Sequence, residues 1–329
     1  MKVLITGGAG FIGYHLAEYH RRRGDGVVIL DNLFKSEGRA DPAFEALVGS
    51  PGVTHIPADL TKPLAPGERV GGDGFDVVYH LAAINGTQLF YEIPYQVART
   101  NLLMTLHLID WLEGRRVGRL VYASTSEVYA GCEQVGLLTI PTAEDIPVVF
   151  PQPTNVRFSY GTSKFMGEFL CFQFGKTRGV PTSVVRYHNI YGPRMGAKHV
   201  IPEFILRLQR RENPFRIYGG RETRAFCYVE DAVAATQLVA QAPGCDQEII
   251  HIGNSREEIT IETLARLLMQ QFGVRLEIRE CGGRSGSVQR RCPDTSKLKR
   301  LTGFEAGIPL KDGLVRTSAW YLRQAEPSR

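Results

Sequence analysis

The start of the chain carries the pattern with the strongest consequence for its fold. Gly7, Gly10 and Gly13 separate the apolar run at residues 3–6 from a helix-like pattern at residues 14–23. In a strand, turn and helix of this kind, the missing side chains let backbone N–H groups and the helix N-terminus approach a pyrophosphate. A glycine-rich turn without a ligand is the simpler alternative. The context predicts the first βαβ unit of a dinucleotide-binding domain.

Strand-like and helix-like segments alternate through the first half of the chain. Apolar runs of strand length stand at residues 3–6, 27–30, 53–56, 77–80, 120–123 and 182–186. This alternation predicts a parallel sheet with helices on both faces. A chain of 329 residues that is 43% hydrophobic can bury a core of that size. We therefore expect an α/β protein with a Rossmann-type, doubly wound parallel sheet.

The alternation breaks after about residue 190. Pro193, Pro202 and Pro214 interrupt short helical windows there. We predict a smaller, discontinuous α/β lobe that binds the substrate and packs against the sheet. The predicted division assigns residues 1–190 and about 225–250 to the dinucleotide-binding Rossmann domain, and about 191–224 and 251–329 to the lobe.

The second predicted strand ends in Asp31 and Asn32, where the ribose of a dinucleotide is bound in such sheets. The Asp31 carboxylate would repel a 2′-phosphate, which favours NAD over NADP, although Lys35 leaves NADP as an alternative. Residues 59–60 and 81–83 follow later strands at the same edge of the sheet. We predict adenine and nicotinamide-ribose contacts there, with ordinary strand-end packing as the alternative.

Composition and patterning exclude several classes of protein. No apolar run approaches the roughly 20 residues of a membrane span, and the N-terminus does not look like a signal sequence. The six cysteines are scattered without a CxxC pair, which indicates a reducing compartment and no zinc site. The net charge of +5 is mild for a nucleic-acid-binding protein. We expect a cytoplasmic protein with no metal, no membrane contact and no nucleic-acid partner.

Tyr160 and Lys164 stand four residues apart at the start of a predicted helix, so they share one of its faces. A neighbouring ammonium group and a cationic nicotinamide ring would lower the pKa of the tyrosine and make it a general base near neutral pH. A tyrosine and lysine at this spacing are more often surface residues. The glycine turn upstream favours the catalytic interpretation.

Together these patterns resemble the extended short-chain dehydrogenase/reductase family, in its nucleotide-sugar epimerase/dehydratase branch. The resemblance covers nearly the whole chain and includes "HLAA" (80–83), "RYHNIYGPR" (186–194), "YGGRETRAFCYVEDA" (218–232) and "RRCPDTSKLKR" (290–300). It implies that a nucleotide sugar, bound by the smaller lobe, is oxidised at C4 by tightly bound NAD⁺, and that the resulting ketone activates the neighbouring positions.

The resemblance also implies roles for individual residues. Tyr160 is the base, Lys164 its electrostatic partner and ribose ligand, and Thr125 the hydroxyl that bonds the C4 oxygen. Ser124 and Ser126 would shape the pocket. The catalytic set is Tyr160, Lys164, Thr125, Glu127 and Ser126. The cofactor set is Gly7, Gly10, Phe11, Ile12, Gly13, Asp31, Asn32, Asp59, Leu60, Leu81, Ala82, Ala83, Asn101, Tyr160, Lys164 and Tyr187. The substrate set is Arg157, Asn189, Tyr218, Arg224 and Arg291.

Glu127 bears on the outcome of the reaction. A 4-epimerase needs no further carboxylate, whereas loss of water across C5 and C6 needs a base for the C5 proton. The Thr-Ser-Glu at residues 125–127 resembles that of UDP-glucuronate decarboxylases and GDP-mannose 4,6-dehydratases. Arg157 and Arg291 favour the decarboxylases, because an arginine can hold a hexuronate carboxylate. We rank a decarboxylase-like or dehydratase-like outcome, with Glu127 assisting at C5, above 4-epimerisation.

The chain also departs from the decarboxylases. It has Ala-Gly-Cys at residues 130–132 where they have Gly-Asp-Pro, and "YGTSK" where they have "YDEGK". Glu127 could instead cap a helix or pair with an arginine. An NADPH-dependent 4-ketoreductase and, in a different class, a non-catalytic dinucleotide-binding sensor are further alternatives.

The remaining expectations concern binding and assembly. Arg224 and Arg291 are expected at the diphosphate and Tyr218 near the base, while His188 and His251 are expected to be structural. The resemblance implies a homodimer built by the helix at about residues 101–112 and the one starting near Tyr160. The apolar stripes on these helices could instead be core; they are Leu102, Leu106, Ile109, Phe165, Phe169 and Phe172.

Overall fold

The structure, a computed structural model, describes residues 1–36, 41–64, 74–282 and 288–325. Seven parallel strands form its central sheet, in the order β13-β8-β7-β5-β1-β2-β3. In chain order they are β1 (Lys2–Thr6), β2 (Gly26–Leu30), β3 (Val53–Ile56), β5 (Val77–His80), β7 (Leu120–Thr125), β8 (Thr182–Tyr187) and β13 (Glu248–Ile252). The strand order reverses between β1 and β5, which is where doubly wound sheets bind dinucleotides.

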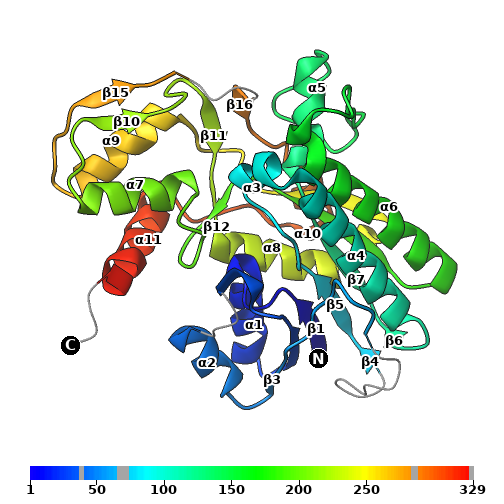
Figure 1. The fold of residues 1–329 in the computed structure, drawn as a ribbon. Coiled ribbons are helices and arrows are strands. Elements are labelled where there is room, and N and C mark those ends of the chain that lie inside the picture. The colour runs from blue at the N-terminus through cyan, green and yellow to red at the C-terminus, as the bar shows by residue number, and fades with distance from the viewer. Residues whose placement is uncertain (37–40, 65–73, 283–287, 326–329) are drawn as a thin grey trace.

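Helices cover both faces of this sheet (Figure 1). On one face, Val3 and Ile5 of β1 share a core with α1 (Phe11–Arg22) and α8 (Val229–Gln241). On the other face, Leu4 shares a core with α4 (Pro94–Leu112) and α6 (Ser159–Arg178). Successive strand residues point to opposite faces, so a sheet buried on both sides requires continuous apolar runs. The predicted Rossmann-type, doubly wound α/β architecture is therefore confirmed.

Helix α6 runs unusually close to β7 and to the turn that follows it. A Cβ added at Gly167 would lie 2.0 Å from the Tyr122 hydroxyl, and one added at Gly161 would lie 2.7 Å from the carbonyl oxygen of Glu127. The missing side chains allow the first turn of α6 to reach the carboxyl end of β7. This contact brings the predicted Tyr160 and Thr125 to the same edge of the sheet.

The second half of the chain adds small sheets and helices beside the carboxyl ends of the strands (Figure 1). The paired strands are β9 (Ile190–Tyr191) with β12 (Cys227–Tyr228), β10 (Phe215–Ile217) with β15 (Ile278–Glu280), and β11 (Thr223–Ala225) with β14 (Glu258–Thr260) and β16 (Arg290–Arg291). The helices α7 (Val200–Gln209), α9 (Ile261–Gln271) and α11 (Leu310–Ala325) pack on one another, and α10 (Ser296–Thr302) packs on α8 and β13.

Short elements complete the described chain. They are η1 (Phe34–Ser36), α2 (Pro42–Val48), β4 (Gly74–Phe75), α3 (Thr87–Glu92), β6 (Arg116–Val117), η2 (Ser126–Tyr129), α5 (Ala130–Gln134), η3 (Val156–Phe158) and η4 (Pro243–Cys245). The predicted division into two domains stays a prediction. Residues 37–40, 65–73, 283–287 and 326–329, which it assigns to one domain or the other, lie outside the described ranges. Among the described residues, no helix is both long and apolar enough to cross a membrane.

Candidate active site

The turn between β1 and α1 forms a cradle that only glycines fit. Gly7 has a φ of +72°, and a Cβ there would lie 2.8 Å from the backbone of Ala82. A Cβ at Gly13 would lie 2.2 Å from the carbonyl oxygen of Gly7. Gly10 is the N-cap of α1 and provides no side-chain cap, so the first N–H groups of the helix face outward. A pyrophosphate fits these open donors, and Phe11 and Ile12 form the first helical turn beside them.

The end of β2 places a carboxylate next to this cradle. Asp31 accepts hydrogen bonds from the backbone N–H of Ala9 at 3.0 Å and of Leu33 at 2.8 Å. These bonds hold the Asp31 carboxylate at the end of β2, the edge of the sheet where the ribose of a dinucleotide would lie. Lys35, which left NADP open, donates to Asn85 at 2.8 Å. Asn32 accepts from the backbone N–H of Phe34 and is exposed.

The other predicted cofactor residues have mixed surroundings. Asp59 accepts hydrogen bonds from Thr61 and so stabilises its own turn, and the Leu60 side chain is buried in the core. Asn101 bonds the backbone of Ile84 and the hydroxyl of Ser163, which ties the loop after β5, residues 81–84, to α6. The hydroxyl of Tyr187 pairs with Thr236 of α8. Their predicted contacts with NAD stay predictions.

Tyr160 and Lys164 lie on the first turns of α6, beside the end of β7. The Tyr160 ring stacks on Phe90 of α3, with the ring centroids 4.9 Å apart and the planes 9° from parallel. The Lys164 side chain is 2% exposed, and its ammonium lies 4.1 Å from the centre of the Tyr122 ring. Burial lowers the pKa of Lys164 to about 8. Burial, and then the Glu127 carboxylate, raise the pKa of Tyr160, so the lowering that general-base catalysis requires must come from bound NAD⁺ and Lys164.

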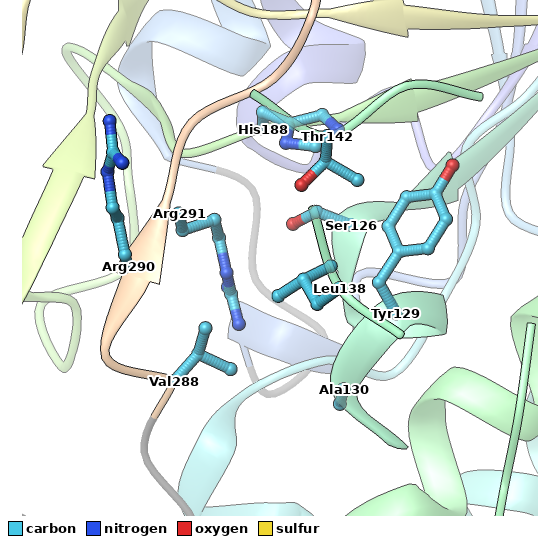
Figure 2. A pocket seen from close by; sticks show the side chains of 9 residues that line it. All are labelled: Ser126, Tyr129, Ala130, Leu138, Thr142, His188, Val288, Arg290 and Arg291. Atoms are coloured by element: carbon cyan, nitrogen blue, oxygen red, sulfur yellow. The ribbon is translucent and has the colours of Figure 1, made fainter. Parts of the chain in front are cut away.

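The hydroxyls of the "YASTSEVY" segment have different surroundings. Thr125 ends β7 and accepts the backbone N–H of Glu127 at 3.2 Å, which leaves its own proton available to a ligand. Ser126 lines a pocket (Figure 2). The expectation that Ser124 shapes the pocket is wrong, because Ser124 donates to the buried Glu168, which pairs with Arg186 on the neighbouring strand. The hydroxyl of Ser124 is therefore used to satisfy a buried ion pair.

Glu127 lies between two arginines from distant parts of the chain. It pairs with Arg157 of η3 and, at 2.9 Å, with Arg291 of β16. The Glu127 side chain is 14% exposed. Burial would raise its pKa, but Arg291 and then Arg157 outweigh burial and lower the pKa to about 2. The alternative in which Glu127 pairs with an arginine is therefore realised, and in this arrangement the carboxylate is a poor base.

The remaining substrate residues gather on the neighbouring strands. Arg224 of β11 is in register with Arg291 of β16, which turns both guanidinium groups toward one face. Burial, and then Arg291, lower the pKa of Arg224 to about 10, while its ion pair with Glu222 at 2.9 Å opposes them. Asn189 has a φ of +45° and donates to the carbonyl of Ala225. Tyr218 follows β10 and is exposed, which disfavours strand packing as its role.

This geometry can be compared with known proteins. Residues 3–253 match the NAD dependent epimerase/dehydratase family. The chain belongs to this family. A UDP-N-acetyl-alpha-D-glucosaminuronate decarboxylase of Bacillus cytotoxicus is 35% identical over 97% of this chain and 97% of its own length.

Solved structures of the family superpose over the whole fold. A UDP-glucose 4-epimerase from Thermotoga maritima, in complex with UDP-glucose, has a TM-score of 0.84 at 28% identity and covers 99% of this chain and 100% of its own. A dTDP-glucose 4,6-dehydratase from Streptomyces venezuelae, with NAD bound, has a TM-score of 0.83 at 27% identity and covers 98% and 97%. The named activities in the family thus include decarboxylation, epimerisation and dehydration.

Sequence reasoning missed one residue of the candidate site, Phe90, and gave another, His188, only a structural role. Phe90 stacks on Tyr160 although the two are far apart in the sequence, and the Arg157 guanidinium lies 5.7 Å from the centre of the same Phe90 ring. His188 lines the pocket in Figure 2. No local pattern marks Phe90, and the "RYHNIYGPR" segment that contains His188 gives no sign that its side chain reaches a pocket. Among the described residues, no group of three or more His, Cys, Asp or Glu side chains could hold a metal ion, and the prediction of no metal stays a prediction.

Proposed function

We propose that this chain is an NAD-dependent decarboxylase of a UDP-linked hexuronate that acts through a transient 4-keto sugar. The observation that carries this proposal is the position of Arg157 and Arg291 on either side of Glu127, next to Thr125 and Tyr160. Two guanidinium groups and one carboxylate leave a net positive charge in a largely buried place. Such a site is suited to a sugar carboxylate, and less suited to the neutral C6 hydroxyl of a hexose.

Oxidation at C4 comes first in the proposed mechanism. The cradle of Gly7, Gly10 and Gly13 and the Asp31 carboxylate would hold NAD⁺, which supplies a hydride acceptor. Thr125 donates a hydrogen bond to the C4 oxygen, and Tyr160 takes the C4 hydroxyl proton as the hydride leaves. The ammonium of Lys164, one helical turn from Tyr160, would lower the pKa of the tyrosine in the NAD-bound protein.

Decarboxylation follows because the C4 ketone lies β to the C6 carboxylate. The C5–C6 bond breaks, CO₂ leaves, and the electron pair moves onto the C4 oxygen as an enolate. Tyr160, now protonated, and Thr125 stabilise that oxygen. C5 then takes up a proton from water. When a hydride returns to C4, Tyr160 gives its proton back to the C4 oxygen, and the cofactor would be left in its oxidised form. No base for a C5 proton is needed, which agrees with a Glu127 whose pKa is about 2 and whose oxygens are both in ion pairs.

The role of Glu127 in this proposal is to orient the two arginines. The sequence-based expectation had Glu127 assisting at C5, and dehydration would require it as a base there. Its low pKa favours decarboxylation over dehydration. The 35% identical decarboxylase of Bacillus cytotoxicus supports the same choice and the UDP nucleotide.

The proposal is tested by incubating the purified protein with UDP-glucuronate, UDP-N-acetylglucosaminuronate, UDP-glucose and dTDP-glucose, followed by mass spectrometry and proton NMR. We expect a loss of 44 mass units (CO₂) from a hexuronate and no net change in NAD. A loss of 18 (water) from a hexose would replace decarboxylation with dehydration. An unchanged mass with a changed C4 proton coupling would replace it with epimerisation, and net consumption of NADPH would indicate a ketoreductase.

We also propose that the chain is organised and located as its family resemblance implies. The sheet of residues 1–190 with about 225–250 would bind NAD, and residues 191–224 and 251–329 would bind the nucleotide sugar. Arg224, on the strand of the second part that pairs with the strand of Arg291, supports a diphosphate site there. A cytoplasmic location is supported by six cysteines that are all free thiols.

We further propose a homodimer formed by α4 and α6. Helix α4 is longer than predicted and begins at Pro94, and it packs along α6. Of the predicted stripe residues, Leu106, Phe165 and Phe169 are exposed and Leu102 is half-buried, whereas Ile109 and Phe172 pack on the core. Met166 extends the exposed apolar face of α6. Pairing this face with a second copy would bury side chains that a monomer leaves in water.

Replacing Phe169 with aspartate is expected to separate the dimer. Phe169 is 57% exposed, so the charge costs little in a monomer but would be desolvated in the interface. Light scattering after gel filtration should change from twice 36.6 kDa to 36.6 kDa. The control is Val315→Asp, at a side chain of α11 that is 54% exposed, which should leave the dimer intact. A monomeric wild-type protein would contradict the proposed interface.

A further inference from the structure

His188 is a buried histidine whose two ring nitrogens have no hydrogen-bond partner among the described residues. Its side chain is 1% exposed, and within the part of the chain that the structure describes neither Nδ1 nor Nε2 is bonded. His80, equally buried, bonds Thr6 at 2.7 Å and Thr105 at 3.1 Å, as a structural histidine does. A buried polar group without a partner costs free energy. The expectation that His188 is structural therefore leaves its two ring nitrogens unexplained.

The backbone holds His188 at the edge of the site. It follows β8 directly, and its N–H donates to the carbonyl of Ile252 at 2.9 Å. Its ring lies 4.4 Å, centroid to centroid, from that of His251. Burial, and then His251, Arg291 and Arg186, hold the pKa of His188 well below its ordinary value. The imidazole is therefore neutral and offers one donor and one acceptor.

The pocket that His188 lines is also lined by Ser126 and Arg291, two of the predicted site residues. Figure 2 shows His188, Thr142 and Ser126 grouped on one side of this pocket and Arg291 on another. Leu138 and Val288 add apolar walls. Ser126 is the neighbour of Thr125, and Arg291 holds Glu127 at 2.9 Å. A sugar whose C4 oxygen reaches Thr125 and whose carboxylate reaches Arg291 would therefore have a ring substituent near His188.

We propose that His188 is a substrate-recognition residue whose imidazole hydrogen-bonds an uncharged substituent of the sugar ring that can both donate and accept, a hydroxyl or an amide. This inference rests on the proposed function for the identity of the sugar nucleotide. In this arrangement the guanidinium groups of Arg157 and Arg291 bind the carboxylate that all hexuronates share, and the neutral imidazole of His188 distinguishes hexuronates by another ring substituent. A hydroxyl would contact only the polar side of the pocket, at His188, whereas the methyl group of an acetamido substituent would also pack against Leu138 and Val288.

The test compares His188→Phe with His188→Gln by titration calorimetry on the NAD-loaded protein. The ligands are UDP, UDP-glucuronate and UDP-N-acetylglucosaminuronate. Loss of the imidazole hydrogen bonds is expected to weaken binding of a sugar nucleotide about tenfold in His188→Phe. UDP, which lacks the hexuronate, should bind as it does to wild type. His188→Gln keeps a donor and an acceptor and should retain affinity within about threefold.

The pattern of loss identifies the recognised group. Weaker binding of both sugar nucleotides indicates a shared hydroxyl, and weaker binding of the acetamido sugar alone indicates the amide. Unchanged binding of both, or an equal loss for UDP, would overturn the inference. NAD content and melting temperature verify the fold, and His188→Met replaces His188→Phe if the phenylalanine variant does not fold.

This readout also separates the inference from the proposed function, because binding needs no turnover. A wild-type protein that binds UDP-hexuronates through His188 but releases no CO₂ refutes decarboxylation alone. One that releases CO₂ while His188→Phe binds normally refutes the role of His188 alone. A wild-type protein that binds neither sugar nucleotide overturns both.

Discussion

Replacing Tyr160 with phenylalanine is expected to lower the turnover number by roughly 10³-fold, because it removes the group that takes the C4 hydroxyl proton. The substituted ring can still stack on Phe90, whose centroid lies 4.9 Å from that of Tyr160, so the fold should not change. Single-turnover measurements of CO₂ release would determine the loss. NAD content, read from absorbance of the denatured protein, should equal that of wild type.

The matched control for this substitution is Tyr95→Phe, which removes the same hydroxyl from an exposed tyrosine at the start of α4. It should leave turnover unchanged. If Tyr160→Phe retains turnover within tenfold of wild type, the assignment of Tyr160 as the base is wrong. If the wild-type protein binds NAD but turns over no sugar nucleotide, a non-catalytic dinucleotide sensor becomes the better hypothesis.

Replacing Arg291 with methionine is expected to lower kcat/KM for the UDP-hexuronate by roughly 10²-fold. Removing one partner of a largely buried ion pair costs several kcal/mol, because the remaining charge is left without its counter-charge. Here the substitution also removes a guanidinium from the proposed carboxylate site. The pKa of Glu127 should rise from about 2 toward its ordinary range, since Arg291 is the main group that lowers it.

Arg266→Met is the matched control, because the same substitution there removes an arginine from an exposed ion pair, with Glu262 on α9. It should change kcat/KM by less than about threefold, as expected for an exposed ion pair. The affinity of Arg291→Met for UDP separates two roles of Arg291. Unchanged UDP affinity supports the carboxylate site, whereas a loss for UDP as large as that for the uronate would assign Arg291 to the diphosphate.

Short-range patterns carried most of what could be predicted. The glycines of residues 7–13 are required because the backbone there approaches other atoms more closely than a Cβ would permit. The pattern that reveals this requirement lies within a few adjacent residues. Asp31 could be placed at the same edge because it directly ends the next strand. Tyr160 and Lys164 could be paired because helical spacing puts them on one face.

Long-range partners could not be predicted in the same way. Whether Glu127 is a base or an ion-pair partner depends on Arg157 and Arg291, and Arg291 is 164 residues away. The Ser124 hydroxyl does not shape the pocket because it donates to the buried carboxylate of Glu168 on α6. Whether the ring nitrogens of His188 find hydrogen-bond partners depends on which segments surround the ring in the folded chain.

By itself the sequence determined the sheet, the cofactor cradle and the placement of Tyr160 and Lys164 on one helix face, because strand alternation, glycine turns and helical spacing act between neighbours in the chain. Only the tertiary structure decided that the pKa of Glu127 is low and that the ring nitrogens of His188 have no partner among the described residues. A pKa and an unsatisfied donor are properties of the three-dimensional surroundings, since burial and nearby charge set them, and those surroundings come from segments that meet only when the chain folds.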